Sequence, residues 1–141
     1  MKKQVTSPCS LVLLESRQPI SAETEQIQTR IRERAYELSL QRGHTGREVD
    51  DWLTAESEII SVPPVEVTEK SGSYHVQLAL AGVRPEDVNV MAAPDQILIK
   101  CDVQHDHAPE AGTVHLCEFK SATIFRPVYF PHIHRPLPPS R

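Results

Sequence analysis

Apolar and polar residues alternate along residues 74–80, and this alternation is the clearest pattern in the chain. The apolar positions are Tyr74, Val76, Leu78 and Leu80. A side-chain period of two is typical of a strand with one buried face. Gly82 and Pro85 then favour a turn, because glycine allows positive φ and proline cannot donate to a strand ladder. The apolar pattern resumes over residues 88–92 and predicts a second strand there.

Two further strands are predicted on either side of this pair. Val65 and Val67 alternate with polar residues, and the Ser-Gly-Ser turn at residues 71–73 joins them to the strand described above. Residues 97–103 form the other strand. Its apolar positions on one face are Ile97, Ile99, Cys101 and Val103.

The remaining C-terminal part completes a β-rich region. Residues 104–112 are polar and contain proline and glycine, so they predict a loop. We expect a short strand at residues 113–120 and an edge strand at 122–130, since Pro127 has no backbone donor for a central ladder. Short strands at near-regular spacing favour a mainly β fold, an immunoglobulin-like antiparallel β-sandwich over residues 62–131.

The N-terminal half has helical spacing instead. Apolar residues recur three and four positions apart, at Ile27, Ile31, Ala35 and Leu38. Ser21 is the expected N-cap and Gly43 the C-terminal stop. A capping-box pattern beginning at Thr45 opens a second helix, in which Trp52 is expected in the core of the pair. The sequence therefore predicts an α-helical hairpin over residues 21–61, ended by two consecutive prolines.

Both ends of the chain lack a sustained pattern. Residues 1–20 contain one apolar run, Leu11–Leu14, and we expect a flexible N-terminal arm there. Two interpretations of this run stay open, a frayed terminus or a short docking segment. Residues 132–141 are rich in proline and predict an extended C-terminal tail.

Residues 80–90 carry a more specific signature. Its members are Leu80, Gly82, Val83, Glu86, Asp87 and Val90. They resemble the signature of the α-crystallin domain of small heat-shock proteins, which usually has proline at the position of Ala81. Further on, residues 97–99 look like the L-x-I strand of that family, and Phe130-Pro131 stands where it has Leu-Pro. The resemblance implies a sandwich that assembles into dimers or larger homo-oligomers.

The resemblance stops at Pro131. The family continues with two more strands and an Ile-x-Ile tail motif, whereas this chain reads HIHRPLPPSR. We therefore expect an α-crystallin-type sandwich that is incomplete at its C-terminus, with an open edge and an uncovered apolar face. The sequence leaves open whether the helical hairpin, the N-terminal arm, a second subunit or a bound client covers that face.

A second resemblance covers the predicted helical hairpin. Its members are Ile31, Arg32, Ala35, Tyr36, Arg42, Gly43, Asp51, Trp52, Ala55 and Glu56. They are similar to a small bacterial domain of unknown function that occurs fused to small heat-shock domains. The resemblance brings no known chemistry.

Net charge and cysteine content bear on the expected partners and on the redox state of the thiols. The net charge of −4 and the pI near 6.0 argue against nucleic acid and anionic membranes as partners. The apolar run Leu11–Leu14 is too short for a signal peptide or a membrane span, so we expect a cytoplasmic protein. Cys9, Cys101 and Cys117 are an odd number without close spacing, which fits reduced thiols. Cys101 and Cys117 are interpreted either as an oxidation-sensitive pair or as buried, unreactive residues.

Candidate chemistry is limited to histidine. The sequence has no glycine-rich phosphate loop, no G-x-S-x-G and no H-E-x-x-H, so we expect no catalytic activity, no cofactor and no small-molecule substrate. It has two H-x-H pairs, His105/His107 and His132/His134. Imidazoles two residues apart on a strand share a face, which suits a transition metal. Further donors within reach in the sequence are Asp106, His115 and Cys117. Because both pairs lie in a predicted loop or tail, we expect no metal.

These observations lead to one functional expectation. The protein is expected to be an ATP-independent holdase that binds partly unfolded client proteins through apolar surface and strand edges. The expected client-binding positions are Leu11, Val12, Leu13, Leu14, Val88, Val90, Phe125, Val128 and Phe130. One alternative is a monomeric adaptor, similar to CS-domain co-chaperones, whose helical hairpin binds one specific partner. Another is a relic that folds poorly.

Overall fold

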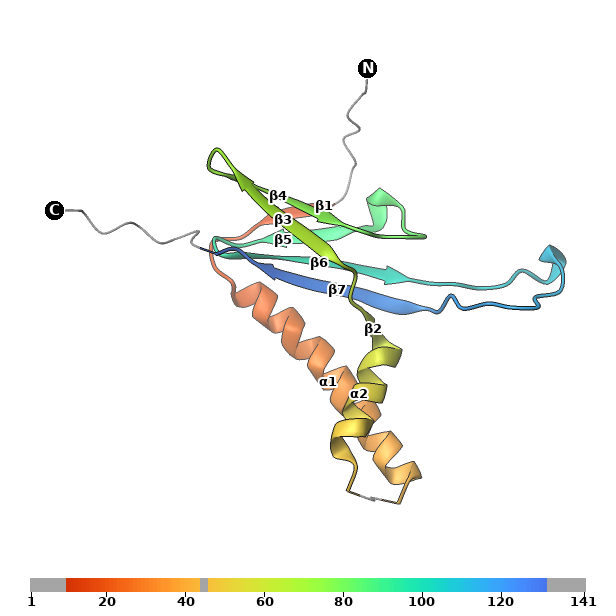
Figure 1. Cartoon of the computed structure of the whole chain (residues 1–141). Coiled ribbons are helices and arrows are strands. Elements are labelled where there is room, and N and C mark those ends of the chain that lie inside the picture. Colours follow the sequence, from red (N-terminus) through yellow and green to blue (C-terminus); the bar gives the residue numbers. More distant parts are fainter. Residues whose placement is uncertain (1–9, 44–45, 132–141) are drawn as a thin grey trace.

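A computed structural model of the chain describes residues 10–43 and 46–131 (Figure 1). The elements, in chain order, are β1 (Ser10–Leu13), α1 (Gln18–Gln41), α2 (Glu48–Ile59), β2 (Ile60–Ser61), β3 (Val65–Lys70), β4 (Ser73–Leu78), η1 (Pro85–Asp87), β5 (Asn89–Ala92), β6 (Gln96–Val103), η2 (Pro109–Ala111) and β7 (Ala122–Tyr129). A five-stranded sheet has the order β1-β5-β6-β7-β2, and β3 pairs with β4 in a second sheet. Figure 1 shows the β3–β4 hairpin on one face of the larger sheet and α1 on the other.

The prediction of a helical hairpin followed by a β-rich region is confirmed. The finer prediction, an immunoglobulin-like antiparallel sandwich, is not confirmed. β1 runs parallel to β5 and β2 runs parallel to β7, so the larger sheet is mixed. The second sheet has only two strands.

The β3–β4 hairpin forms where the sequence predicts it. Its two strands pair in register from Val65 opposite Leu78 to Lys70 opposite Ser73. Ser71 and Gly72 both have positive φ, 54° and 80°, which is the backbone of a two-residue type I′ turn. The right-handed twist of this turn matches that of the strands it joins.

The β3–β4 hairpin covers an apolar core on one face of the larger sheet, which we call the hairpin-side core. The buried members of this core are Val88, Ile99, Cys101, Ile124 and Val128. Leu78 and Leu80, from β4 and the residues after it, pack against them. The alternating positions that predict the strands of residues 74–80 and 97–103 therefore meet in one core.

The opposite face of the larger sheet is covered by α1. Of the expected candidates, the helical hairpin therefore lies there. The buried members of this second core, which we call the helix-side core, are Ile20, Ile27, Leu98 and Phe125. Leu98 has no exposed surface, so β6 is buried on both faces and not on one as its pattern indicates. Beside this core, Nζ of Lys100 lies 2.6 Å from Oε1 of Glu23.

Residues 10–20, which the sequence places in a flexible arm, form β1 and the start of α1. The helix begins at Gln18 and not near Ser21, because Pro19 occupies the first turn. Proline suits that position, since its φ is already helical and the missing N–H would have no partner in the helix. Residues 1–9 and the predicted tail at 132–141 lie outside the described residues.

The helical hairpin projects beyond the sheet at its far end (Figure 1). Ala55 of α2 is fully buried in the hairpin, and Asp51 is buried beside Arg42, with Nη2 to Oδ1 at 3.2 Å. Arg34 of α1 donates to Glu58 of α2, with Nε to Oε1 at 2.7 Å. This hydrogen bond lowers the pKa of Glu58 and raises that of Arg34. Neither helix of the described part has the length and apolar composition needed to cross a bilayer.

Two strand predictions near the C-terminus have different outcomes. The predicted strand at 113–120 is absent, because these residues form irregular backbone in the connection between β6 and β7. The predicted strand at 122–130 forms as β7, but it is not the edge of the sheet, because β2 pairs with its outer side. β2 pairs only with Thr123 and Ile124 of β7, so Pro127 stands beyond β2 where no ladder donor is needed.

Candidate functional site: an apolar edge strand

The expected client-binding residues fall into two groups in the structure. Val88, Phe125 and Val128 are core side chains, 9%, 5% and 5% exposed. Val90 and Phe130 are half-buried against the hairpin-side core, and the ring of Phe130 stacks on Tyr74 at a centroid distance of 4.6 Å. The three buried residues present no contact surface in this fold. In the second group, Leu11, Val12 and Leu13 are exposed on β1, whereas Leu14, just after it, is half-buried.

β1 is the edge strand of the larger sheet. It pairs in parallel with β5, from Ser10 opposite Asn89 to Leu13 opposite Ala92. Within the part of the chain that the structure describes, no strand pairs with its other side. Leu14, the next residue, donates its N–H to the carbonyl of Ala92 at 2.8 Å and packs into the helix-side core. The edge is therefore held firmly on one side and is open on the other.

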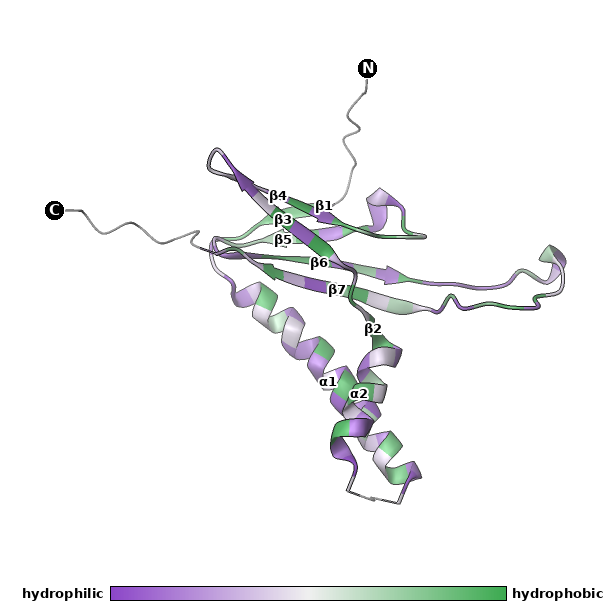
Figure 2. Cartoon of the chain, in the orientation of Figure 1, coloured by the Kyte–Doolittle hydropathy of each residue, from purple (hydrophilic) through white to green (hydrophobic). Residues whose placement is uncertain are grey.

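The side chains of β1 are apolar and exposed. Leu11, Val12 and Leu13 are 58%, 47% and 78% exposed. Paired residues in adjacent strands share a face, so Leu11 lies on the face of its partner Val90, whereas Val12 lies on that of Met91. Val90 belongs to the hairpin-side core and Met91 to the helix-side core. β1 thus extends the apolar surface of both faces by one exposed strand. In Figure 2 much of the β1 ribbon has the green of hydrophobic residues.

The backbone of β1 also has a defined open side. Ser10 donates to the carbonyl of Val88, just before β5, and Leu14 donates to that of Ala92 on β5. Because successive residues in a parallel strand direct their N–H and C=O groups to opposite edges, those of Leu11 and Leu13 face away from β5. No strand of the described residues pairs with these groups, so they can pair with an added strand.

The other strand edges are protected. At the far side of the larger sheet β2 has two residues, Ile60 and Ser61, and residues 63–64 that follow are both proline. Short edges and proline both prevent strand addition. β3 carries Glu66, Glu69 and Lys70, and the side chains of β4 that alternate with its apolar ones are polar. Among the described strands, β1 is the one whose edge is apolar.

The sequence identifies this segment as a candidate binding site but does not predict that it forms a strand. The signal was present, since Leu11, Val12 and Leu13 are apolar and Val12 is β-branched. A run of four apolar residues is too short to predict a strand by periodicity. Only the position of β5 beside it shows that the run is part of a sheet.

The structure also brings together residues of the predicted histidine chemistry. His105, His107 and Cys117 have ligand atoms that all lie within 4.8 Å of one another. Cys101, by contrast, is buried in the hairpin-side core, where desolvation, with smaller contributions from the nearby Asp87 and Asp102 carboxylates, raises the pKa of its thiol. Cys101 and Cys117 are both free thiols in this structure. The pair His132/His134 lies outside the described residues.

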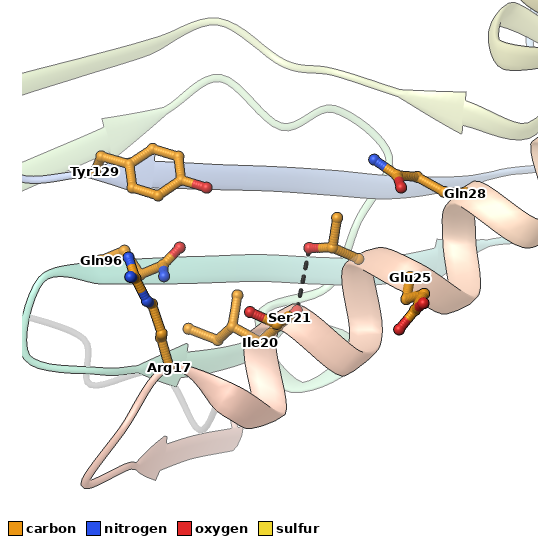
Figure 3. Close-up of a pocket in the computed structure, with 8 residues that line it drawn as sticks. Arg17, Ile20, Ser21, Glu25, Gln28, Gln96 and Tyr129 are labelled. Atoms are coloured by element: carbon orange, nitrogen blue, oxygen red, sulfur yellow. Dashed lines mark hydrogen bonds between the residues drawn. The ribbon is translucent and has the colours of Figure 1, made fainter.

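A polar pocket lies where the first turns of α1 meet the ends of β6 and β7 (Figure 3). Its lining includes Arg17, Gln96 and Tyr129. The guanidinium of Arg17 lies 3.4 Å from Oδ2 of Asp95, and the side chain of Gln96 is buried at the floor, 3% exposed. Because the pocket is open and its rim residues belong to the helix–sheet contact, we interpret it as part of that joint.

Comparison with known proteins identifies one part of the chain. Residues 26–60 match the family DUF2934, described as a protein of unknown function. This segment covers most of α1, all of α2 and the beginning of β2, and it agrees with the resemblance of the helical hairpin to a bacterial domain of unknown function. No curated protein and no solved structure matches the chain. The resemblance of residues 63–131 to the α-crystallin domain stays a prediction.

Proposed function

We propose that the protein is an ATP-independent holdase, which binds extended segments of partly unfolded proteins along β1. The observation that carries this proposal is the open, apolar edge of β1, where Leu11 and Leu13 are 58% and 78% exposed. Exposed edges of this kind are normally avoided, because they pair with other chains. A chain that retains one has a surface suited to strand addition.

Two physical terms contribute to binding at this edge. The outward N–H and C=O groups of Leu11 and Leu13 pair with a client backbone, which makes binding tolerant of client sequence. Apolar client side chains pack beside Leu11 and Leu13 on one face and Val12 on the other. At about 25 cal/mol per Å² of buried apolar area, an area of about 200 Å² would contribute about 5 kcal/mol before the entropy of ordering the client is subtracted. Reversible, moderate affinity is what a holdase requires.

The resemblance of residues 63–131 to the α-crystallin domain also supports this proposal, because that family has holdase activity and forms oligomers. We include in the proposal a homo-dimer or larger homo-oligomer as the assembled state. Non-native proteins are the proposed partners, and no enzymatic step, nucleic acid, membrane or small-molecule substrate is part of the mechanism. A cytoplasmic location would suit such clients.

Suppression of client aggregation tests the proposal. Light scattering of a heat-labile client is followed with and without the full chain, in the absence of ATP. The Leu11→Lys variant places a charge on the edge, and the matched control is Leu53→Lys on α2, since Leu53 has a similar exposure of 55%. We expect the wild type and Leu53→Lys to suppress aggregation and Leu11→Lys to lose most of that activity. Equal activity of the two variants would reject β1 as the site, and an inactive, well-folded wild type would reject the holdase.

One observation favours a second function, a monomeric adaptor that binds a specific partner through the helical hairpin. The projecting part of the hairpin exposes Leu40, Val49 and Leu53 at 50%, 72% and 55%. A charged residue introduced at this end of the helical hairpin would then weaken partner binding, whereas one introduced on β1 would not. Light scattering after size-exclusion chromatography distinguishes the two states of assembly, because the adaptor is monomeric and the holdase is an oligomer.

A further inference from the structure

The connection between β6 and β7, residues 104–121, extends well beyond the sheet as two long limbs (Figure 1). We call it the β6–β7 arm. It contains one short helix, η2, at its tip and no paired strands. Loops longer than about 15 residues without strands or longer helices are uncommon, and they are usually functional or disordered. The arm therefore needs something that holds its limbs together.

Three side chains with metal-binding atoms meet across the two limbs. His105 and His107 come from the outgoing limb and Cys117 from the returning one. The Nε2 atoms of the two histidines are 3.2 Å apart, and Sγ of Cys117 lies 3.4 Å from Nε2 of His105. All three ligand atoms lie within 4.8 Å of one another.

Local structure explains why they converge. In extended backbone, side chains two residues apart point to the same side, so the H-x-H spacing directs both imidazoles towards the returning limb. The backbone N–H of His105 donates to Oγ of Ser121 at 2.9 Å, which joins the limbs beside the cluster. The ring of Phe119 lies against that of His105, at a centroid distance of 5.1 Å. At the base of the arm, Lys120 donates to the carbonyl of Ser57 in α2.

Two of the three distances in this cluster are close to those of a tetrahedral zinc site, and the third is within 4.8 Å. Zinc–nitrogen bonds of about 2.05 Å and zinc–sulfur bonds of about 2.3 Å place two nitrogens about 3.3 Å apart, and nitrogen and sulfur about 3.6 Å apart. The observed 3.2 Å and 3.4 Å differ from these values by a few tenths of an ångström. Without a metal, the two ring nitrogens share one hydrogen bond, in which one donates and the other accepts. Coordination would replace that hydrogen bond.

We infer that His105, His107 and Cys117 form a site for a thiophilic divalent transition metal, with Zn²⁺ as the best fit to the donor set. Two imidazoles and a thiolate disfavour Mg²⁺ and Ca²⁺, which prefer oxygen ligands. Because His107 is exposed and the other two residues are half-buried, the fourth position is open to water. This site is independent of the proposed holdase function, since it lies on the β6–β7 arm and not on β1.

Metal binding here would hold the two limbs of the β6–β7 arm together. Coordination joins the outgoing limb to the returning one, and closing a long loop in this way removes conformational entropy from the open arm. The thiol of Cys117 loses its proton when the metal binds, and both histidines bind as neutral imidazoles. Metal binding is therefore expected to order residues 104–121.

Titration of the full, metal-free chain with Co²⁺ and Zn²⁺ tests the inference. The test variants are His107→Ala and Cys117→Ala, and the matched control is His115→Ala, an exposed histidine of the same arm outside the cluster. We expect one equivalent of Co²⁺ to give a thiolate-to-metal charge-transfer band, which Zn²⁺ displaces. The band should be lost in Cys117→Ala, both test variants should bind Zn²⁺ at least about tenfold more weakly, and His115→Ala should behave as wild type.

Two further measurements check the folding of the variants and the protection of Cys117 by the metal. Circular dichroism of the metal-free variants checks that they fold, which is expected because none of the three side chains is in either core. Alkylation of Cys117, followed by peptide mapping, should slow when Zn²⁺ is added. Wild-type protein without a thiolate band, or Zn²⁺ affinity that is unchanged in both test variants, would overturn the inference and place any bound metal on other residues.

Discussion

Lys100, in the middle of β6, forms an ion pair with Glu23 in the first part of α1, with Nζ to Oε1 at 2.6 Å. The two residues belong to different predicted domains, the β-sandwich and the helical hairpin. Their contact borders the helix-side core of Ile20, Ile27, Leu98 and Phe125. The first turns of the helical hairpin are therefore packed onto the sheet, and its far end alone projects freely.

Stability should depend strongly on this joint. Ile20→Ala is expected to destabilise the protein by about 2–5 kcal/mol, because Ile20 is 2% exposed and its loss leaves a cavity between α1 and β6. Urea unfolding followed by circular dichroism measures the change. The control is Val49→Ala on the exposed surface of α2, 72% exposed, which should change stability by less than about 0.5 kcal/mol. Similar values for the two variants would contradict the packing of α1 on the sheet.

The ion pair itself should contribute little. Both side chains are about one-third exposed, so Glu23→Gln is expected to cost less than about 1 kcal/mol. Solvent screening weakens such pairs, and the difference between variant and wild type should shrink further at high salt. Unfolding at low and high ionic strength measures this. A large, salt-independent loss would instead indicate a packing role for the stem of Lys100.

Hydrogen exchange should reveal the open side of β1 residue by residue. In the free protein the amides of Leu11 and Leu13 are expected to exchange fast, whereas that of Leu14, which donates to Ala92, should exchange slowly. If clients bind by strand addition, a client should slow the exchange of Leu11 and Leu13. Amide-resolved exchange by nuclear magnetic resonance gives both results. Uniform protection along β1 in the free protein would show that its outer edge is already covered.

The two described cysteines should differ in reactivity. Burial raises the pKa of the Cys101 thiol, with smaller contributions from Asp87 and Asp102, so its reactive thiolate is scarce at neutral pH. Cys117 is only partly buried. We expect a maleimide to modify Cys117 before Cys101, and modification of Cys101 to become fast only at high pH or on unfolding. Peptide mapping across a pH series checks this, and early modification of Cys101 would place it outside the core.

The sequence by itself determined the local elements. The alternation of residues 74–80 marks β4, and the Ser71-Gly72 turn sets the hairpin in register with β3. The three- and four-residue spacing of apolar positions marks α1. These features follow from short-range rules, because side-chain period and turn geometry depend on neighbouring residues. The match of residues 26–60 to a known family follows the same part of the chain.

The tertiary structure decided what no local pattern contains. Leu11, Val12 and Leu13 belong to an edge strand because β5 lies beside them, and Leu98 is buried because α1 covers a face that its strand pattern leaves exposed. His105 and Cys117 are candidate ligands only because the two limbs of the β6–β7 arm run together. The physical reason is shared, since each feature depends on a contact between residues distant in sequence. The free energy of such a contact depends on the whole fold that brings the two residues together.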